Sequence, residues 1–286
     1  MTAGEHDYRS TVTVLGVRRD GGQESMSEIT TAVSFHGGFE AAFSTGDNAA
    51  VLPTHTMSNT VTALLPDYLG RAREEFVRDL AEHFLDACPA VRRVRVSTTD
   101  RPWEPLRRAD GSRSPHAYAG SARELRTAAA TADRDGATVV SGGVSNLWLG
   151  MTTGSSFTGF LRDAYTTKAE QYDRPMEAVF ALEWEYRAGV LDYAAARDTV
   201  RETVPRAFAE HTSLSSQHTL HVLGSAVVAA CPEVASVRLT CLAHDHPLVD
   251  LSPFGRANDR QVYAAPRVPC SLTHLTVASP SADEVR

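Results

Sequence analysis

The sequence predicts an α+β fold in which one structural unit of a 286-residue chain occurs twice. Two patterns indicate the class: segments of alternating apolar and polar residues typical of strands, and amphipathic segments typical of helices. The third observation is a repeat. Residues 87–96 (ACPAVRRVRV) and 230–239 (ACPEVASVRL) are similar and lie 143 residues apart, half the chain length. Duplication of one unit accounts for this match, and we place the two domains at residues 1–136 and 137–286.

Strands are expected first in each domain. Residues 29–35 (ITTAVSF) and 180–186 (FALEWEY) both place every second side chain on an apolar face, as a half-buried strand does. Asp20-Gly21-Gly22 predicts the turn of a hairpin before the first of these strands. Residues 101–114, rich in Arg, Pro and Gly, predict an exposed excursion.

Helices are expected next, and each precedes one copy of the repeat. In the first half an apolar face is formed at four-residue spacing by Ala72, Phe76, Leu80 and Phe84. In the second half it is formed by Leu220, Leu223 and Val227. Pro89 and Pro232 then end the two helices, because proline lacks an N–H and disfavours helical geometry in the preceding residue. Each half therefore predicts antiparallel strands, then helices, then further strands.

Composition excludes several classes of partner. A hydrophobic content of 42% with 22% charged residues is typical of a soluble globular protein, and the net charge of -7 argues against a nucleic-acid partner. No apolar run approaches the roughly 20 residues of a membrane span, and the first residues are polar, so we expect a cytoplasmic bacterial protein. The cysteines form no C-x-x-C pair and are interpreted as buried structural thiols: Cys88, Cys231, Cys241 and Cys270.

The most informative segment is residues 155–174, SSFTGFLRDAYTTKAEQYDR. It resembles the SxFxGFLRDxYTTLxExxDR block of the urate oxidases (uricases), in which the Phe and Arg grip a flat purine. On this resemblance Phe157 and Arg174 bind substrate. The resemblance also implies two tandem T-fold (tunnelling-fold) domains, antiparallel sheets with helices on one face. Family members form homo-oligomers, here expected to be homotetramers, whose sheets close into a barrel with sites at subunit interfaces.

Two further blocks extend the resemblance. Residues 47–61 (DNAAVLPTHTMSNTV) are similar to the DNxxVxATDxxKNTV block, which aligns Thr54 with the catalytic threonine and puts His55 where the family has aspartate. Residues 208–219 (FAEHTSLSSQHT) resemble FAxxxSxSVQxT, so Gln217 matches the purine-reading glutamine and Ser216 replaces valine.

Other catalytic positions of the family are altered. Residues 249–255 (VDLSPFG) resemble the segment after the catalytic histidine. Counting back from it replaces the oxygen-site asparagine with Ala243 and the relay histidine with Asp245. A one-residue slip would put His246 or His244 there instead. Near the N-terminus, the catalytic lysine aligns with Arg9, and the only lysine of the chain is Lys168.

The three matched side chains suit a flat heterocycle. We call Phe157, Arg174 and Gln217 the clamp: an aromatic face stacks on the ring, a guanidinium fork binds a planar edge, and an amide offers a donor and an acceptor. The altered positions affect proton transfer instead. Arg9 stays protonated and cannot act as a base, so the candidate proton acceptors are His55, with an ordinary pKa near 6.5, and Asp245 or His246.

These residues predict an enzyme that oxidises a urate-like 8-oxopurine with O2 as co-substrate and no cofactor. The Ser216 hydroxyl can accept a hydrogen bond from an exocyclic amino group, which favours a 2-amino purine such as 8-oxoguanine, with oxidation at C5 and rearrangement to a triazine or hydantoin-type product. Three alternatives stay open: ordinary urate oxidase, a purine-ring hydrolase, and a non-catalytic purine-binding subunit. No metal is expected, because His244 and His246 have no identifiable third ligand nearby.

Overall fold

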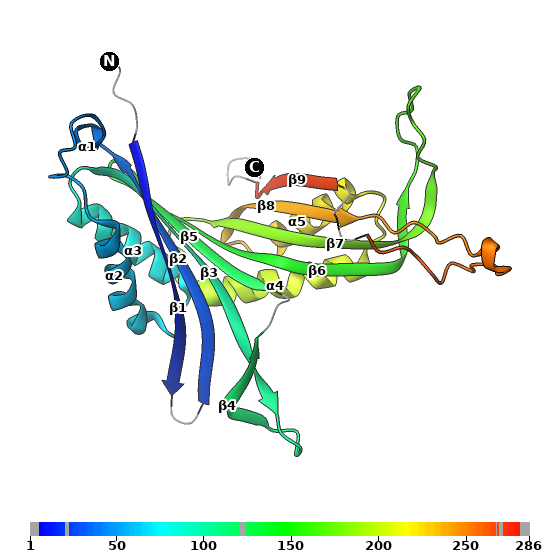
Figure 1. Ribbon diagram of the computed structural model, residues 1–286, viewed down its shortest axis with the longest axis horizontal. Coiled ribbons are helices and arrows are strands. Elements are labelled where there is room, and N and C mark those ends of the chain that lie inside the picture. Colours follow the sequence, from blue (N-terminus) through cyan, green and yellow to red (C-terminus); the bar gives the residue numbers. More distant parts are fainter. Residues whose placement is uncertain (1–5, 21–22, 121–123, 267, 269–270, 281–286) are drawn as a thin grey trace. The chain divides into compact units, whose positions relative to one another are not determined.

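The computed structural model describes residues 6–20, 23–120, 124–266, 268 and 271–280 (Figure 1). Its contacts divide the chain into two compact units. Unit 1 is Met1–Ser145 with Glu183–Arg197, and unit 2 is Asn146–Leu182 with Asp198–Arg286. The predicted boundary after residue 136 separates the two copies of the repeated unit, whereas these two units are defined by compactness. The predicted boundary therefore stays a prediction.

Unit 1 begins with a long hairpin. Strands β1 (His6–Asp20) and β2 (Gln23–Gly37) pair antiparallel throughout, so Arg9 lies opposite Ser34. The predicted turn residues Gly21 and Gly22 lie outside the described residues. Helices α1 (Glu40–Ser44), α2 (Thr54–Leu64) and α3 (Arg73–Ala87) follow, with the short 3-10 helix η1 (Leu65–Tyr68) between the last two. The chain then returns to the sheet in β3 (Val91–Arg107), β4 (Arg113–Gly120) and β5 (Leu125–Asp133).

The second half repeats this order. Strands β6 (Val139–Phe157) and β7 (Gln171–Tyr186) precede helices α4 (Tyr193–Glu210) and α5 (Ser216–Ala230), and β8 (Val234–His244) and β9 (Ser271–Ala278) close the unit, with the 3-10 helix η2 (Ser252–Phe254) between them. The hydrogen-bonded order is β1-β2-β3-β5-β6 in the first half and β6-β7-β8-β9 in the second. Both halves are thus antiparallel α+β units, which confirms the predicted fold class.

Helices cover one face of the sheet in each unit. Helix α3 packs on β3 and β5 in unit 1, and α5 packs on β8 and β9 in unit 2 (Figure 1). The predicted apolar faces supply these contacts. Of the predicted helix residues, Phe76, Phe84, Leu220 and Leu223 are fully buried, as are Phe35 on β2 and Phe180 on β7. Each such side chain contributes about 1.5–3 kcal/mol through removal from water, which fixes the helices on the strands.

The ends of α3 and α5 have the same local geometry. The C-terminal caps are Cys88 (φ -123°, ψ 89°) and Cys231 (φ -125°, ψ 91°), and each N–H donates to the carbonyl four residues before it. Both cysteine carbonyls then accept from the N–H three residues later, at 3.0 Å. The sequence repeat is therefore a structural repeat at the point where a helix gives way to a strand.

The two cap residues Cys88 and Cys231 are buried, as predicted, and so is Cys241 on β8. Burial together with the neighbouring Glu233 carboxylate raises the pKa of Cys231 to about 11, so the reactive thiolate form is suppressed. Cys270 lies outside the described residues.

The predicted excursion at residues 101–114 is mostly exposed, as expected, and forms most of a second hairpin. Strand β3 continues to Arg107 and pairs antiparallel with β4, and only the short connection after Arg107 is irregular. Pro102 and Pro105 lie within β3, and only Gly111 is at the tip; proline is tolerated in strands near a sheet edge.

Candidate active site

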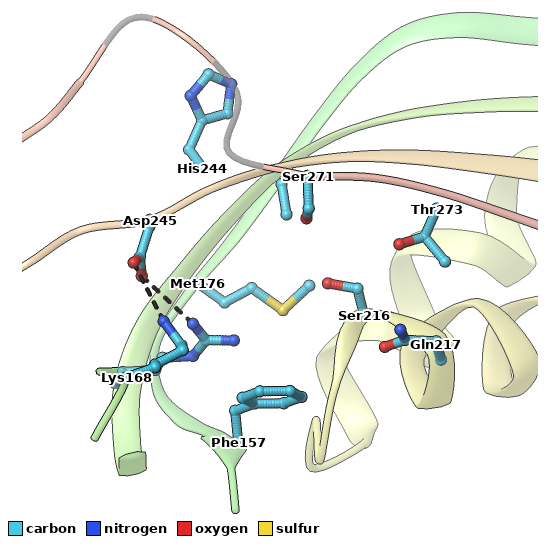
Figure 2. A pocket seen from close by; sticks show the side chains of 11 residues that line it. Phe157, Lys168, Met176, Ser216, Gln217, His244, Asp245, Ser271 and Thr273 are labelled. Atoms are coloured by element: carbon cyan, nitrogen blue, oxygen red, sulfur yellow. Dashed lines mark hydrogen bonds and ion pairs between the residues drawn. The ribbon is translucent and has the colours of Figure 1, made fainter. Parts of the chain in front are cut away.

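A cavity of about 310 Å³ opens in unit 2 (Figure 2). It collects seven of the residues singled out from the sequence, together with the only lysine of the chain: Phe157, Arg174, Ser216, Gln217, Ala243, His244, Asp245 and Lys168. Met176, Ser271 and Thr273 complete a mixed polar and apolar wall. Segments more than 100 residues apart along the chain thus converge on one recess.

The end of β6 delivers Phe157 to this recess. Gly154, just before it, has φ +78°, a left-handed conformation that glycine adopts without a steric penalty. At this bend the Gly154 carbonyl accepts from the Ser213 N–H at 2.9 Å, and Ser156 N–H donates to the Ser213 carbonyl at 2.8 Å. These two bonds dock the segment before α5 against the end of β6, which brings the helix beside Phe157.

The first turn of α5 carries Gln217, the third clamp residue, and Ser216 beside it. Ser215 is its N-cap, with extended backbone geometry, and its hydroxyl accepts from the His218 N–H at 3.1 Å. Ser216 and Gln217 are the first two helical residues, so the cap fixes where their side chains begin. Figure 2 shows both side chains projecting from the helix into the recess, with the Ser216 hydroxyl on the cavity side.

Asp173 fixes the backbone next to Arg174. Its carboxylate accepts from Thr153 Oγ1 at 2.9 Å, from Gly154 N–H at 2.8 Å and from Arg260 Nη2 at 2.6 Å. The Arg260 guanidinium, followed by the Gly154 N–H, holds the pKa of Asp173 below its usual value. The carboxylate therefore stays ionised at working pH and ties the bend of β6 to β7 beside the clamp.

Two clamp residues are already close to one another. The Phe160 ring stacks on Phe157 with centroids 4.9 Å apart and an angle of 10° between the planes. The Arg174 guanidinium carbon lies 6.0 Å from the Phe157 ring centroid. An aromatic ring braced in this way offers a flat surface of fixed orientation, and a guanidinium near that surface can donate to the polar rim of a flat ligand.

Charge in the recess is concentrated on three side chains. Asp245 lies between two cations: its Oδ1 is 3.4 Å from Arg174 Nη1, and its Oδ2 is 3.3 Å from Lys168 Nζ (Figure 2). Gln171 Oε1 accepts a further bond from Arg174 Nη1 at 3.0 Å. Sequence reasoning did not assign Lys168 to the site. The available signal was that it is the only lysine of the chain and departs from the leucine of the block it lies in.

His246 lies elsewhere, although a shifted alignment would give it the relay position. Its Nε2 is 3.1 Å from Glu177 Oε2, and its Nδ1 is 3.1 Å from the Ala264 carbonyl oxygen. His244 borders the cavity but stacks on Trp148, with ring centroids 5.7 Å apart. The two imidazoles thus have separate partners, and within the described ranges no three His, Cys, Asp or Glu side chains are arranged to hold a metal ion.

The remaining predicted residues belong to unit 1. Thr54 and His55 are exposed and begin α2, directly after Pro53. The contact between this helix start and β1 is made by Ser10, whose hydroxyl donates to the Thr54 carbonyl at 3.1 Å. Arg9, the preceding residue, lines a separate depression with Ser34 and Arg95. The catalytic roles of Arg9, Thr54 and His55 therefore stay predictions.

The fold defines a class: a tandem T-fold protein, here with a recess lined by polar and aromatic side chains. The sequence model of the family described as Uricase matches residues 27–131 and 140–273. A uricase of Arthrobacter globiformis is 32% identical over 278 residues, covering 97% of this chain and 90% of that protein. A uricase of Dictyostelium discoideum is 30% identical over 240 residues, or 84% and 83% of the two chains.

The fold comparison agrees. The crystal structure of the Arthrobacter globiformis uricase aligns with a TM-score of 0.89 and 32% identity, over 97% of this chain and 95% of that one. The chain therefore belongs to the uricase family. Members of this family are oxidoreductases that take O2 as co-substrate without a resident cofactor, and the chain is an enzyme of this class.

Proposed function

We propose that the chain oxidises a urate-like 8-oxopurine with O2 and that its substrate carries a 2-amino group, as 8-oxoguanine does. The observation that carries the proposal is the cavity that joins the clamp to Ser216. Phe157 supplies a stacking surface, Arg174 a bidentate donor, and Gln217 a donor and acceptor for the NH–C=O edge of the pyrimidine ring.

Ser216 carries the substrate preference. The family block has valine at this position, and valine has no side-chain acceptor. The hydroxyl on the cavity side of α5 can accept a hydrogen bond from an amino group, which valine cannot do. The hydroxyl could also donate to the C2 carbonyl of urate, but the family block has valine here, so urate does not require this contact. Leaving the amino group of a bound ligand unpaired would cost about 1–3 kcal/mol, which is enough to discriminate between the two purines.

The proposed chemistry begins with a deprotonated purine. The purine anion gives two electrons to O2, which takes up two protons, the one removed by the proton acceptor and a second N–H proton of the purine, and leaves as hydrogen peroxide. Water then adds at C5 of the oxidised purine. A strained intermediate of this kind can rearrange to a triazine or a hydantoin-type product. Because Arg9 cannot accept a proton, we assign that role to His55 or Asp245.

Ordinary urate oxidation is the second candidate, and one observation favours it. Lys168 and Arg174 bring two positive charges to the recess against the single Asp245 carboxylate, and urate is an anion at neutral pH. In that case urate, O2 and water yield 5-hydroxyisourate and hydrogen peroxide. Purine-ring hydrolysis and binding without turnover are outcomes of the same test.

Oxygen consumption tests the proposal. Purified protein is given urate and 8-oxoguanine in parallel, without added metal or cofactor, and compared with Ser216→Val. We expect uptake with 8-oxoguanine, and a shift of the kcat/KM ratio toward urate by about tenfold in the variant. Uptake with urate alone would establish the ordinary reaction. Turnover without O2 uptake would indicate a hydrolase, and thermal stabilisation without turnover a binding protein.

We further propose a cytoplasmic homotetramer, on the basis of the family resemblance. Within the described residues, no helix has the length and apolarity needed to cross a membrane. Sedimentation velocity of the purified chain would give the mass of the assembly, and a monomer retaining full activity would contradict the expectation of sites at subunit interfaces.

A further inference from the structure

Two departures from the uricase blocks meet in space. Lys168 replaces the leucine of the YTTL motif in the segment between β6 and β7. Asp245, just after β8, aligns with the relay histidine when the segment is counted without a gap. They lie 77 residues apart in sequence, yet Lys168 Nζ and Asp245 Oδ2 are 3.3 Å apart, and both side chains line the cavity (Figure 2).

The Asp245 carboxylate alone would be unfavourable at this place. A negative charge in the wall of the recess repels an anionic purine and also pairs with Arg174, the cation needed to bind the ligand edge. The Lys168 ammonium opposes both effects. With Lys168 present, the three side chains carry two positive charges and one negative charge.

We propose that Lys168 is a substrate-binding residue of this pocket, which offsets Asp245 and leaves the charge of Arg174 for an anionic purine. The inference rests on the proposed function, because it takes the cavity to be the site of an 8-oxopurine. It adds that the pocket recognises the deprotonated form, the form that donates electrons to O2.

The placement of the three charges distinguishes this pair from an ordinary surface ion pair. Exposed pairs contribute little, since water screens them. Here the side chain of Arg174 is 21% exposed, that of Asp245 33% and that of Lys168 40%. The Lys168–Asp245 pair therefore lies at the rim of the recess, and Arg174, on the inner side of Asp245, is mostly enclosed. A ligand that fills the cavity excludes more water and strengthens the interaction with Lys168 further.

Anaerobic binding isolates this effect from catalysis. Kd values for urate, an anion at neutral pH, and for 8-oxoguanine, which is neutral there, are measured by calorimetry without O2. Lys168→Met removes the charge at similar length and should weaken urate binding about tenfold, or about 1.4 kcal/mol, with a smaller effect on 8-oxoguanine. Lys168→Arg keeps the charge and should bind urate within about threefold of the unsubstituted protein.

A double-mutant cycle tests the pairing itself. In Lys168→Met/Asp245→Asn the uncompensated carboxylate is gone, so urate binding should return to within about threefold of the original. Arg256→Met, an exposed residue of the same unit outside the cavity lining, removes the same charge and should leave Kd unchanged. Equal urate binding by Lys168→Met and the unsubstituted protein would overturn the inference and leave the proposed function standing. If the unsubstituted protein binds neither purine, both fail.

Discussion

The Arg174 side chain has several partners at once. Its Nη1 donates to Gln171 and lies near Asp245, while its guanidinium approaches the Phe157 ring. A planar fork can satisfy these partners and still present an N–H edge to a ligand. A lysine ammonium, a single compact charge, cannot do so.

Arg174→Lys therefore tests geometry at constant charge. We expect kcat/KM for the preferred purine to fall about a hundredfold, because the ligand loses its bidentate contact and its alignment on Phe157. Steady-state oxygen uptake gives the ratio, and Arg256→Lys serves as the matched control. A variant with activity within threefold of the original would show that charge alone is needed at this position.

The N-terminal cap of helix α5 positions two side chains that line the cavity. Its N-cap Ser215 satisfies an N–H of the first turn, and that same turn carries Ser216 and Gln217. The stability of the helix start and the position of two ligand-facing side chains are thus set by one hydroxyl.

Ser215→Ala should lower the free energy of unfolding by about 1 kcal/mol and raise KM more than it lowers kcat. The physical reason is that fraying of the first turn displaces Gln217 without touching the reacting atoms. Urea unfolding and steady-state kinetics measure the two effects. Ser112→Ala, which removes a hydroxyl bonded to Asp110 in an exposed turn, should change neither by as much. An unchanged KM would mean that packing, and not the cap, holds the helix start.

The stability of the whole chain depends on a buried carboxyl group in unit 1. Glu74 on α3 is 2% exposed and accepts from the Tyr186 hydroxyl at 3.0 Å. Burial raises the pKa of Glu74, and burial together with the Glu74 charge raises the pKa of Tyr186. A folded-state pKa above the unfolded value means that Glu74 favours folding when protonated, and that this contribution is lost as pH rises through the raised pKa.

Glu74→Gln should consequently reduce the pH dependence of the unfolding temperature. The amide keeps an acceptor for Tyr186 but cannot ionise, so above the ordinary glutamate pKa of about 4.3 the Tm of the variant should fall less with rising pH. Compared with the unsubstituted protein, we expect the Tm of the variant to be higher at pH 8 by about 2–4 °C, after correction for any difference at pH 4. Differential scanning calorimetry from pH 4 to 8 measures both Tm profiles. Glu75→Gln removes a neighbouring carboxylate that pairs with Arg71 at the surface, and its pH profile should follow the original. Parallel profiles for Glu74→Gln and the original would exclude this role for Glu74.

Much of the architecture was accessible from the sequence because it depends on local pattern. Apolar residues at four-residue spacing placed α3 and α5, alternation placed β2 and β7, and the Ala-Cys-Pro repeat located the matching helix ends. The hairpin formed by β4 and the end of β3 was not predicted, because most of its residues are exposed or half-buried and leave no alternating apolar pattern in the sequence.

The sequence by itself determined the α+β class, the repeat and the family resemblance, because motifs and periodicity are properties of neighbouring residues. Only the tertiary structure decided which altered positions act together. Lys168 and Asp245 are far apart in the chain, and their pairing depends on how the segment after β6 and the end of β8 meet at one cavity. The same folding turned His246 toward Glu177 and placed Asp245 beside Arg174. Side-chain charge is a property of the sequence, but the partner of a charge is fixed by long-range packing.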